Sequence, residues 1–185
     1  MSKLKLVKKD DAKPEVKAIL SDVEKKYGFI PNLMSAFADS PPTLQGYLQL
    51  SEFTGMTLFS PEEQQAIFLA TSYENGCEYC MAAHSMMALK VAGMPKVRLD
   101  AIRSGKKFED KKFGALVDFT KDVVRLRGNL SQETVNNFLS LGYTNQHVLE
   151  VILGVTMKTL SNYVNHLAET PLDKAFQEFK WMRNS

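Results

Sequence analysis

An all-α fold is predicted for this chain of 185 residues, because helix-start and helix-stop signals recur along its whole length. Ser60-Pro61-Glu62-Glu63 combines an N-cap, a proline at the first helical position and a capping-box glutamate. Asn75-Gly76 then ends that helix. Val, Ile and Thr do not alternate with polar residues over useful lengths, so no strand pattern competes with the helices.

Prolines or N-cap residues open the expected helices, and glycines or a proline close them. In chain order the expected helices are 14–26 (opened by Pro14, closed by Gly28), 32–38 (after Ile30-Pro31), 41–54 (opened by Ser40-Pro41, closed by Gly55), 61–73, 77–93 (closed by Gly93), 95–103 (opened by Pro95, closed by Gly105), 113–126 (closed by Gly128), one capped by Ser131 and closed by Gly142, and 146–167 (capped by Thr144, closed by Pro171). Residues 172–181 are expected to form an amphipathic tail. Helices 60–73 and 77–93 are expected to pair as a central hairpin.

The bulk composition favours one globular domain over residues 1–185. Its expected core is 40–127, with N-terminal helices in 1–39 and C-terminal helices in 131–185 packed on it. Apolar residues make up 44% of the chain, and the formal net charge is +2. This balance argues against nucleic-acid and membrane-surface roles. No apolar run is long enough to span a membrane and no signal peptide is visible, so a cytoplasmic location is expected.

The two cysteines of the chain lie in one short motif, Cys77-Glu78-Tyr79-Cys80, and His84 follows four residues later. On a helix, positions 77, 80 and 84 share one face. Structural disulfides are rare in the cytoplasm, so a close pair there indicates a catalytic, redox-sensing or metal-binding role. A helix precedes the motif and no strand does, which argues against a thioredoxin fold.

The residues alone leave the roles of these thiols open. A helix N-terminus favours a thiolate at Cys77, whereas the nearby imidazole of His84 favours one at Cys80. Buried structural thiols and a zinc site are the alternatives, although zinc usually needs a fourth ligand or a water. His84 can also be a partly buried histidine without a catalytic role.

The stretch from Ser60 to His84 resembles the AhpD-like, carboxymuconolactone decarboxylase superfamily. The helix, the Asn-Gly turn, the C-x-Y-C motif and the histidine carry this resemblance over about residues 55–95. The ends resemble the longer peroxidase-related branch, through Gly28-Phe29-Ile30-Pro31-Asn32, Gly142-Tyr143-Thr144, Asn162 and Pro171-Leu172-Asp173.

The resemblance implies an all-helical subunit that assembles into trimers or hexamers. It implies a peroxidase or disulfide-reductase cycle in antioxidant defence that needs no bound cofactor or metal. Cys80 would attack a hydroperoxide, Cys77 would resolve the sulfenic acid, and His84 would belong to the proton relay. The implied partners are the hydroperoxide and a dithiol, thioredoxin or lipoyl-type reductant.

The sequence departs from the pattern at Gln65, where the family's hydroperoxidases carry a proton-accepting glutamate twelve residues before the first cysteine. Glutamine is not a base near neutral pH, and Glu62, Glu63 and Glu74 do not match the spacing. Two alternatives follow. One is a redox-sensing helical oligomer without catalysis, and the other is a carboxymuconolactone decarboxylase-like enzyme without peroxidase activity.

Overall fold

The computed structural model describes residues 4–183, and every regular element within them is helical, which confirms the all-α prediction. Residues 1–3 and 184–185 belong to the expected domain but lie outside the described residues. The elements are η1 (Lys9–Asp11), α1 (Pro14–Tyr27), α2 (Asn32–Phe37), α3 (Pro41–Thr54), α4 (Pro61–Glu74), α5 (Glu78–Lys90), α6 (Lys96–Ser104), α7 (Lys111–Arg125), α8 (Gln132–Ser140), α9 (Asn145–Ala168) and η2 (Lys174–Phe179).

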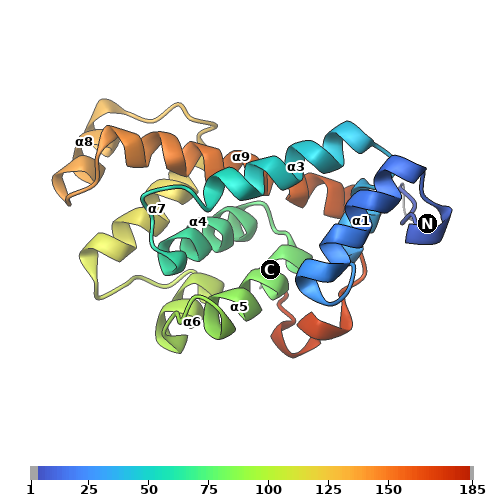
Figure 1. Ribbon diagram of the computed structural model, residues 1–185. Coiled ribbons are helices and arrows are strands. Elements are labelled where there is room, and N and C mark those ends of the chain that lie inside the picture. Colours follow the sequence, from blue (N-terminus) through green and yellow to red (C-terminus); the bar gives the residue numbers. More distant parts are fainter. Residues whose placement is uncertain (1–3, 184–185) are drawn as a thin grey trace.

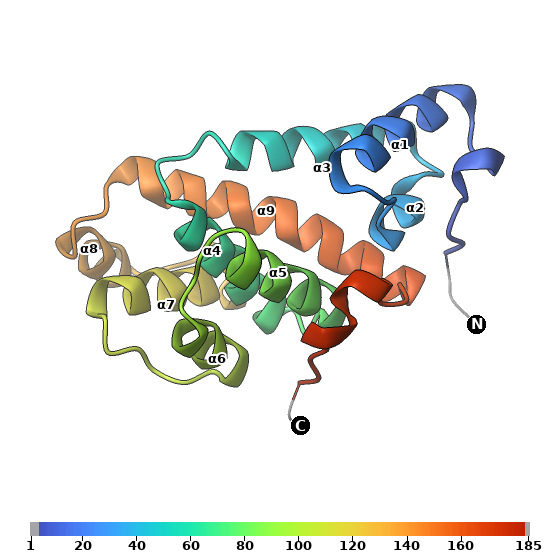
Figure 2. The ribbon, with the colours of Figure 1, turned by 60° about the horizontal axis from the view of Figure 1, so that its bottom comes forward.

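Helix α4 occupies the centre of the molecule and packs against α5, α7 and α9. Residues 66–72 of α4 are all buried, so neighbours surround this stretch on every side. The long helix α9 passes between α3 on one side and α4 and α5 on the other (Figures 1 and 2). The expected hairpin of α4 and α5 is confirmed, and it brings the cysteine motif against α9.

Side-chain caps set several of these helix starts, as the sequence predicts. Ser60 accepts a hydrogen bond from the backbone N–H of Glu63, and the Glu63 carboxylate accepts one from the N–H of Ser60. Helix α7 begins two residues earlier than expected, because Asp110 caps it by accepting from the N–H groups of Lys112 and Phe113. The expected tail forms a short 3-10 helix, η2, rather than an α-helix.

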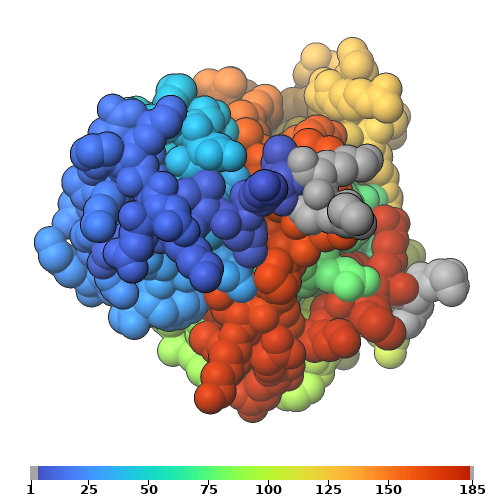
Figure 3. All heavy atoms as spheres, turned by 90° about the vertical axis from the view of Figure 1, so that its right-hand side faces the viewer, coloured from blue at the N-terminus to red at the C-terminus, as the bar shows by residue number. Residues whose placement is uncertain are grey.

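The N-terminal helices and the C-terminal tail lie on one face of the molecule, on either side of the C-terminal end of α9 (Figure 3). The tail also packs against α5. Segments from both ends of the sequence therefore surround the helix that carries the cysteines. None of the helices in residues 4–183 combines the length and the apolar character that a membrane crossing requires.

Candidate redox site

The cysteine motif lies where the turn after α4 meets the first turn of α5. Cys77 is the N-cap residue of α5, and its N–H donates to the carbonyl oxygen of Ser72. Cys80 lies in the first turn of the helix. Both side chains are buried, and both are free thiols hydrogen bonded to one another.

Three side chains of α9 surround the Cys80 sulfur. The Lys158 ammonium nitrogen, Nζ, lies 3.3 Å from Sγ, and the Asn165 amide nitrogen lies 3.2 Å from it. The Ser161 hydroxyl is 3.8 Å away. All three groups can donate hydrogen bonds, and such donors stabilise a thiolate more than a thiol.

The two cysteines differ in their pKa values as a result. Burial raises the pKa of Cys80, but the hydrogen bond from Cys77, the charge of Lys158 and the bond from Ser161 outweigh burial and hold this pKa well below its usual value. The hydrogen bond to Cys80 and burial raise the pKa of Cys77. The geometry therefore favours a thiolate at Cys80 and a neutral thiol at Cys77. This is the reverse of what the helix N-terminus alone favours.

The His84 imidazole reaches Cys80 through Lys158 rather than directly. Its Nε2 lies 2.9 Å from Lys158 Nζ, and its Nδ1 lies 2.9 Å from Gln65 Oε1. Because an amide oxygen only accepts, Nδ1 carries the proton and Nε2 accepts from the ammonium group. Burial and the charge of Lys158 hold the pKa of His84 well below 6.5, so the ring is neutral. The charged imidazole that the sequence allowed is disfavoured here.

Sequence reasoning missed all three side chains that α9 contributes. Lys158, Ser161 and Asn165 lie one turn apart along one stripe of the helix. A signal for Lys158 was present, because it occupies a position on the apolar stripe that contains Val151 and Met157. A lysine on a core-facing stripe indicates a buried partner. Asn162, one of the residues that carried the family resemblance, instead links α9 to the last turn of α4, through Ser72 and the C-cap residue Asn75.

A cavity of about 320 Å³ opens onto Cys80, His84 and Lys158. Ten of its 21 lining residues carry an aromatic or thioether side chain, and they come from α1 and the segment after it, from α2, α3, α4, α5 and α9, and from the tail. These are Tyr27, Phe29, Met34, Tyr47, Phe68, Tyr79, Met86, Met87, Met157 and Phe176. The site is thus an apolar pocket with a few polar groups at the sulfur, as small-molecule sites usually are.

A carboxylate joins the walls of this cavity. Asp173 accepts hydrogen bonds from the Tyr79 hydroxyl at 2.5 Å and from the backbone N–H of Asn32 at 3.1 Å. The Asn32 amide in turn donates to the carbonyl oxygen of Pro171. Two of the end segments that resemble the peroxidase-related branch therefore meet beside the cysteine helix.

The three glutamates considered for a proton relay are engaged elsewhere. Glu62 pairs with Arg98, and Glu74 pairs with Arg125. Glu63 caps its own helix. The carboxylate expected at the position of Gln65 thus has no described substitute near His84.

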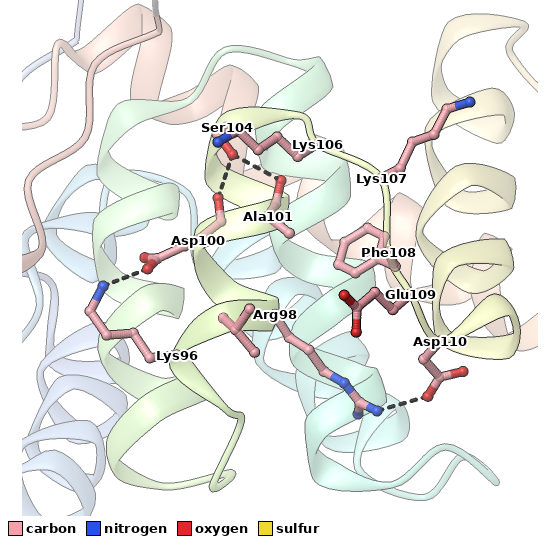
Figure 4. Close-up of a pocket in the computed structure, with 11 residues that line it drawn as sticks. Lys96, Arg98, Asp100, Ala101, Ser104, Lys106, Lys107, Phe108, Glu109 and Asp110 are labelled. Atoms are coloured by element: carbon pink, nitrogen blue, oxygen red, sulfur yellow. Dashed lines mark hydrogen bonds and ion pairs between the residues drawn. The ribbon is translucent and has the colours of Figure 1, made fainter.

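The basic stretch around α6 lines a separate hollow of about 590 Å³ with no cysteine or histidine in its wall. Figure 4 shows Lys96 directed to Asp100, and Arg98 directed to Asp110. These charges are paired with one another, as in a solvated helix and loop. Across residues 4–183, no group of three or more His, Cys, Asp or Glu side chains is arranged to hold a metal ion.

The model of the carboxymuconolactone decarboxylase family matches residues 43–106, and this segment contains both cysteines and His84. The resemblance noted in the sequence is thereby confirmed. No curated protein is significantly similar to the chain in sequence.

Solved structures share the fold over nearly the whole chain. A peroxidase-related protein with an alkylhydroperoxidase AhpD core, from Ralstonia eutropha JMP134, has a TM-score of 0.83 at 18% identity and covers 95% of this chain and 94% of its own. A peroxidase-related protein from Silicibacter sp. TM1040 has a TM-score of 0.80 at 18% identity, with 95% and 93% covered.

The debrominase Bmp8, solved in complex with 2,3,4-tribromopyrrole, has a TM-score of 0.77 at 18% identity, with 97% of each chain covered. The family is enzymatic in general. The matching family is named for a decarboxylase, and the similar structures are named for an alkylhydroperoxidase and a debrominase.

Proposed function

We propose that this protein is a thiol-dependent peroxidase that reduces organic hydroperoxides, with Cys80 as the nucleophile and Cys77 as the resolving thiol. The observation that carries the proposal is the set of hydrogen-bond donors around Cys80 Sγ at the base of an apolar cavity. A thiolate is the reactive form of cysteine, and an apolar wall suits the organic part of a hydroperoxide.

The proposed cycle uses the two sulfurs, a proton and an external dithiol. The Cys80 thiolate attacks the terminal peroxide oxygen, the O–O bond breaks, and a sulfenic acid and an alkoxide form; the alkoxide takes up the proton and becomes the alcohol. Cys77 then attacks the Cys80 sulfur, and water leaves as the disulfide forms. A dithiol of the thioredoxin or lipoyl type restores both thiols by exchange.

We extend the proposal to the protein as a whole. The cavity takes its lining from Tyr27 through Phe176, which supports a single functional domain over residues 1–185. Assembly into trimers or hexamers and a cytoplasmic location remain predictions from the sequence.

The test measures hydroperoxide consumption by purified protein supplied with cumene hydroperoxide and dihydrolipoamide. Cys80→Ser is expected to abolish turnover. Cys77→Ser is the matched control, because it is expected to form the sulfenic acid once and then stop. If wild type and Cys80→Ser consume peroxide equally with every dithiol supplied, the peroxidase proposal is lost. A disulfide that forms and changes the assembly state without turnover would favour the redox-sensing oligomer.

Reductive dehalogenation of an aromatic ring is a second candidate. It is motivated by the aromatic and thioether wall facing Cys80 and by the fold shared with a debrominase. Two thiols supply the two electrons that replace a carbon–bromine bond by carbon–hydrogen, with bromide as the leaving ion. Bromide release from 2,3,4-tribromopyrrole in the presence of a dithiol tests it, and no release above that of Cys80→Ser rejects it.

A further inference from the structure

Lys158 is the largest fully buried side chain of the described residues, with no exposed surface. Its ammonium nitrogen lies between two acceptors, the Cys80 sulfur at 3.3 Å and His84 Nε2 at 2.9 Å. Burying an ammonium group is costly unless it is hydrogen bonded and its charge is balanced. The position of this group therefore calls for a counter-charge.

The groups that face Lys158 leave one source for that charge. Among residues 4–183, no carboxylate forms an ion pair with it. From α5 it meets Cys80 and the neutral ring of His84, and from α3 Tyr47 lies near the same sulfur with its hydroxyl kept protonated by burial. The thiolate of Cys80 balances the ammonium, so the two form a buried ion pair.

Formation of a disulfide removes this negative charge. The ammonium group is then buried without a counter-ion, which is energetically costly. When Cys80 attacks a hydroperoxide, the oxygen that leaves is a base, and it forms in the cavity that Lys158 also lines.

We propose that Lys158 is the catalytic acid of this site: it gives its proton to the oxygen that leaves when Cys80 attacks a hydroperoxide, and it later takes a proton from Cys77. This inference rests on the peroxidase function proposed above. His84 and Gln65 act as positioning residues, because Nε2 accepts from the ammonium group while Nδ1 is held by the glutamine oxygen. Lys158 thereby performs the proton transfer that the family's hydroperoxidases assign to a glutamate, which is Gln65 in this chain.

The atoms balance through the cycle. The thiolate and the hydroperoxide give a sulfenic acid and an alkoxide, and Lys158 protonates the alkoxide to the alcohol and becomes a neutral amine. The amine takes the proton of the Cys77 thiol, and the resulting thiolate displaces hydroxide from Cys80, which Lys158 protonates to water. Reduction of the disulfide by a dithiol returns one neutral thiol, one thiolate and one proton, and the proton recharges Lys158.

The experiment compares Lys158→Arg with wild type. A guanidinium group keeps the positive charge beside the sulfur but cannot be deprotonated in proteins, so it separates charge stabilisation from proton donation. Sulfenic acid formation in a single turnover is followed with an alkyl hydroperoxide and with a peroxyacid. The carboxylate that leaves from a peroxyacid needs no proton.

With the alkyl hydroperoxide, Lys158→Arg is expected to lose roughly 100-fold or more in rate, the usual contribution of a general acid. With the peroxyacid, the loss is expected to be less than about tenfold, because that reaction needs no general acid. Equal losses with both oxidants, or full activity with both, would overturn the acid role of Lys158. The peroxyacid rate also reports whether the variant folds with a reactive thiolate.

Two controls separate this inference from the proposal on which it rests. Lys121→Met removes another buried lysine, whose amine lies over the ring of Tyr73, and should leave the ratio of the two rates unchanged. A wild-type protein that reacts with neither oxidant would overturn the peroxidase proposal itself. A solvent deuterium isotope effect on the wild-type reaction is expected with the alkyl hydroperoxide and not with the peroxyacid, and its absence with the alkyl hydroperoxide would contradict proton donation without any variant.

Discussion

The Cys80 sulfur lies where burial and hydrogen bonding act on its ionisation in opposite directions. Burial alone would keep this thiol protonated, and at Cys77 the hydrogen bond to Cys80 and burial together raise the pKa. The hydrogen bond from Cys77 and the donors on α9 reverse this at Cys80, and Lys158 is the charged donor among them. At the scale of the residue, the site therefore depends on an interaction between side chains 78 positions apart.

Replacing Lys158 with methionine tests this electrostatic balance. Lys158→Met is expected to raise the pKa of Cys80, because burial remains while the positive charge and its hydrogen bond are lost. The measurement is the rate of Cys80 alkylation as a function of pH, with each cysteine resolved by peptide mapping. Lys121→Met serves as the matched control, and an alkylation profile equal to that of wild type in Lys158→Met would contradict the ion pair.

The neutral state of His84 predicts a loss of stability in mild acid. Its pKa is lowered in the folded protein and is near 6.5 in the unfolded chain, so below that pH the unfolded state binds more protons. The free energy of unfolding should therefore fall as pH falls below about 6.5, by at most about 1.4 kcal/mol per pH unit from this group. The lowered pKa of Cys80 adds a loss of the same sign that begins below 9.0.

Urea unfolding at pH 7.5, 6.5 and 5.5 isolates the histidine term. His84→Gln is expected to reduce the decline between the last two points more than the decline over the first interval, and the contribution of Cys80 remains in both. His166→Gln, at an exposed position on α9, should keep the wild-type slope. A His84→Gln variant with the full decline would show that the ring titrates normally.

Helix α9 approaches α4 closely enough that one position excludes a side chain. A Cβ atom at Gly154 would lie 2.8 Å from the Cγ2 atom of Ile67, which is itself buried. Gly154 is one turn before Lys158 on the same helix. At the scale of the element, this close contact sets how far the donors of α9 stand from the cysteine helix.

Gly154→Ala is expected to destabilise the protein by roughly 1 kcal/mol, since overpacking of about 1–3 kcal/mol exceeds the gain of about 1 kcal/mol in helix propensity. Gly46→Ala is the matched control, because α3 has open space at that position. That variant should be stabilised by up to about 1 kcal/mol. Chemical denaturation measures both changes, and equal signs would argue against the tight contact.

Asp173 connects segments from the two ends of the chain to the cysteine helix, and so belongs to the scale of the whole molecule. It accepts from the Tyr79 hydroxyl of α5 and from the N–H of Asn32 at the start of α2. The tail continues to Trp181, whose indole N–H donates to the carbonyl oxygen of Arg103 on α6. The wall of the cavity is thus held by contacts far apart in sequence.

Removing this carboxylate leaves a buried hydroxyl and a backbone N–H without their acceptor. Asp173→Ala is expected to lower the free energy of unfolding by about 2–4 kcal/mol. Asp22→Ala, which breaks an exposed ion pair on α1, should change it by less than about 0.5 kcal/mol. Urea denaturation provides the comparison, and a small effect of Asp173→Ala would indicate that the ends are held without it.

Local signals predicted most of the helices to within a few residues. The capping box at Ser60 and the N-caps at Ser131 and Thr144 act within one turn, so neighbouring residues are sufficient to predict them. The start of α7 was missed because the cap is Asp110, which the sequence presents as part of a charged run. The tail formed η2 because its short amphipathic segment packs on α5 instead of extending as a helix.

By itself, the sequence determined the all-helical fold and the placement of the two cysteines and His84 in one helical register, because helix periodicity and capping depend on spacing along the chain. Only the tertiary structure decided which side chains surround Cys80, why His84 is neutral, and that Lys158 stands between them. These features depend on the packing of α9 against α5. Helices distant in sequence pair according to how side chains pack throughout the core, and no local sequence pattern specifies that pairing.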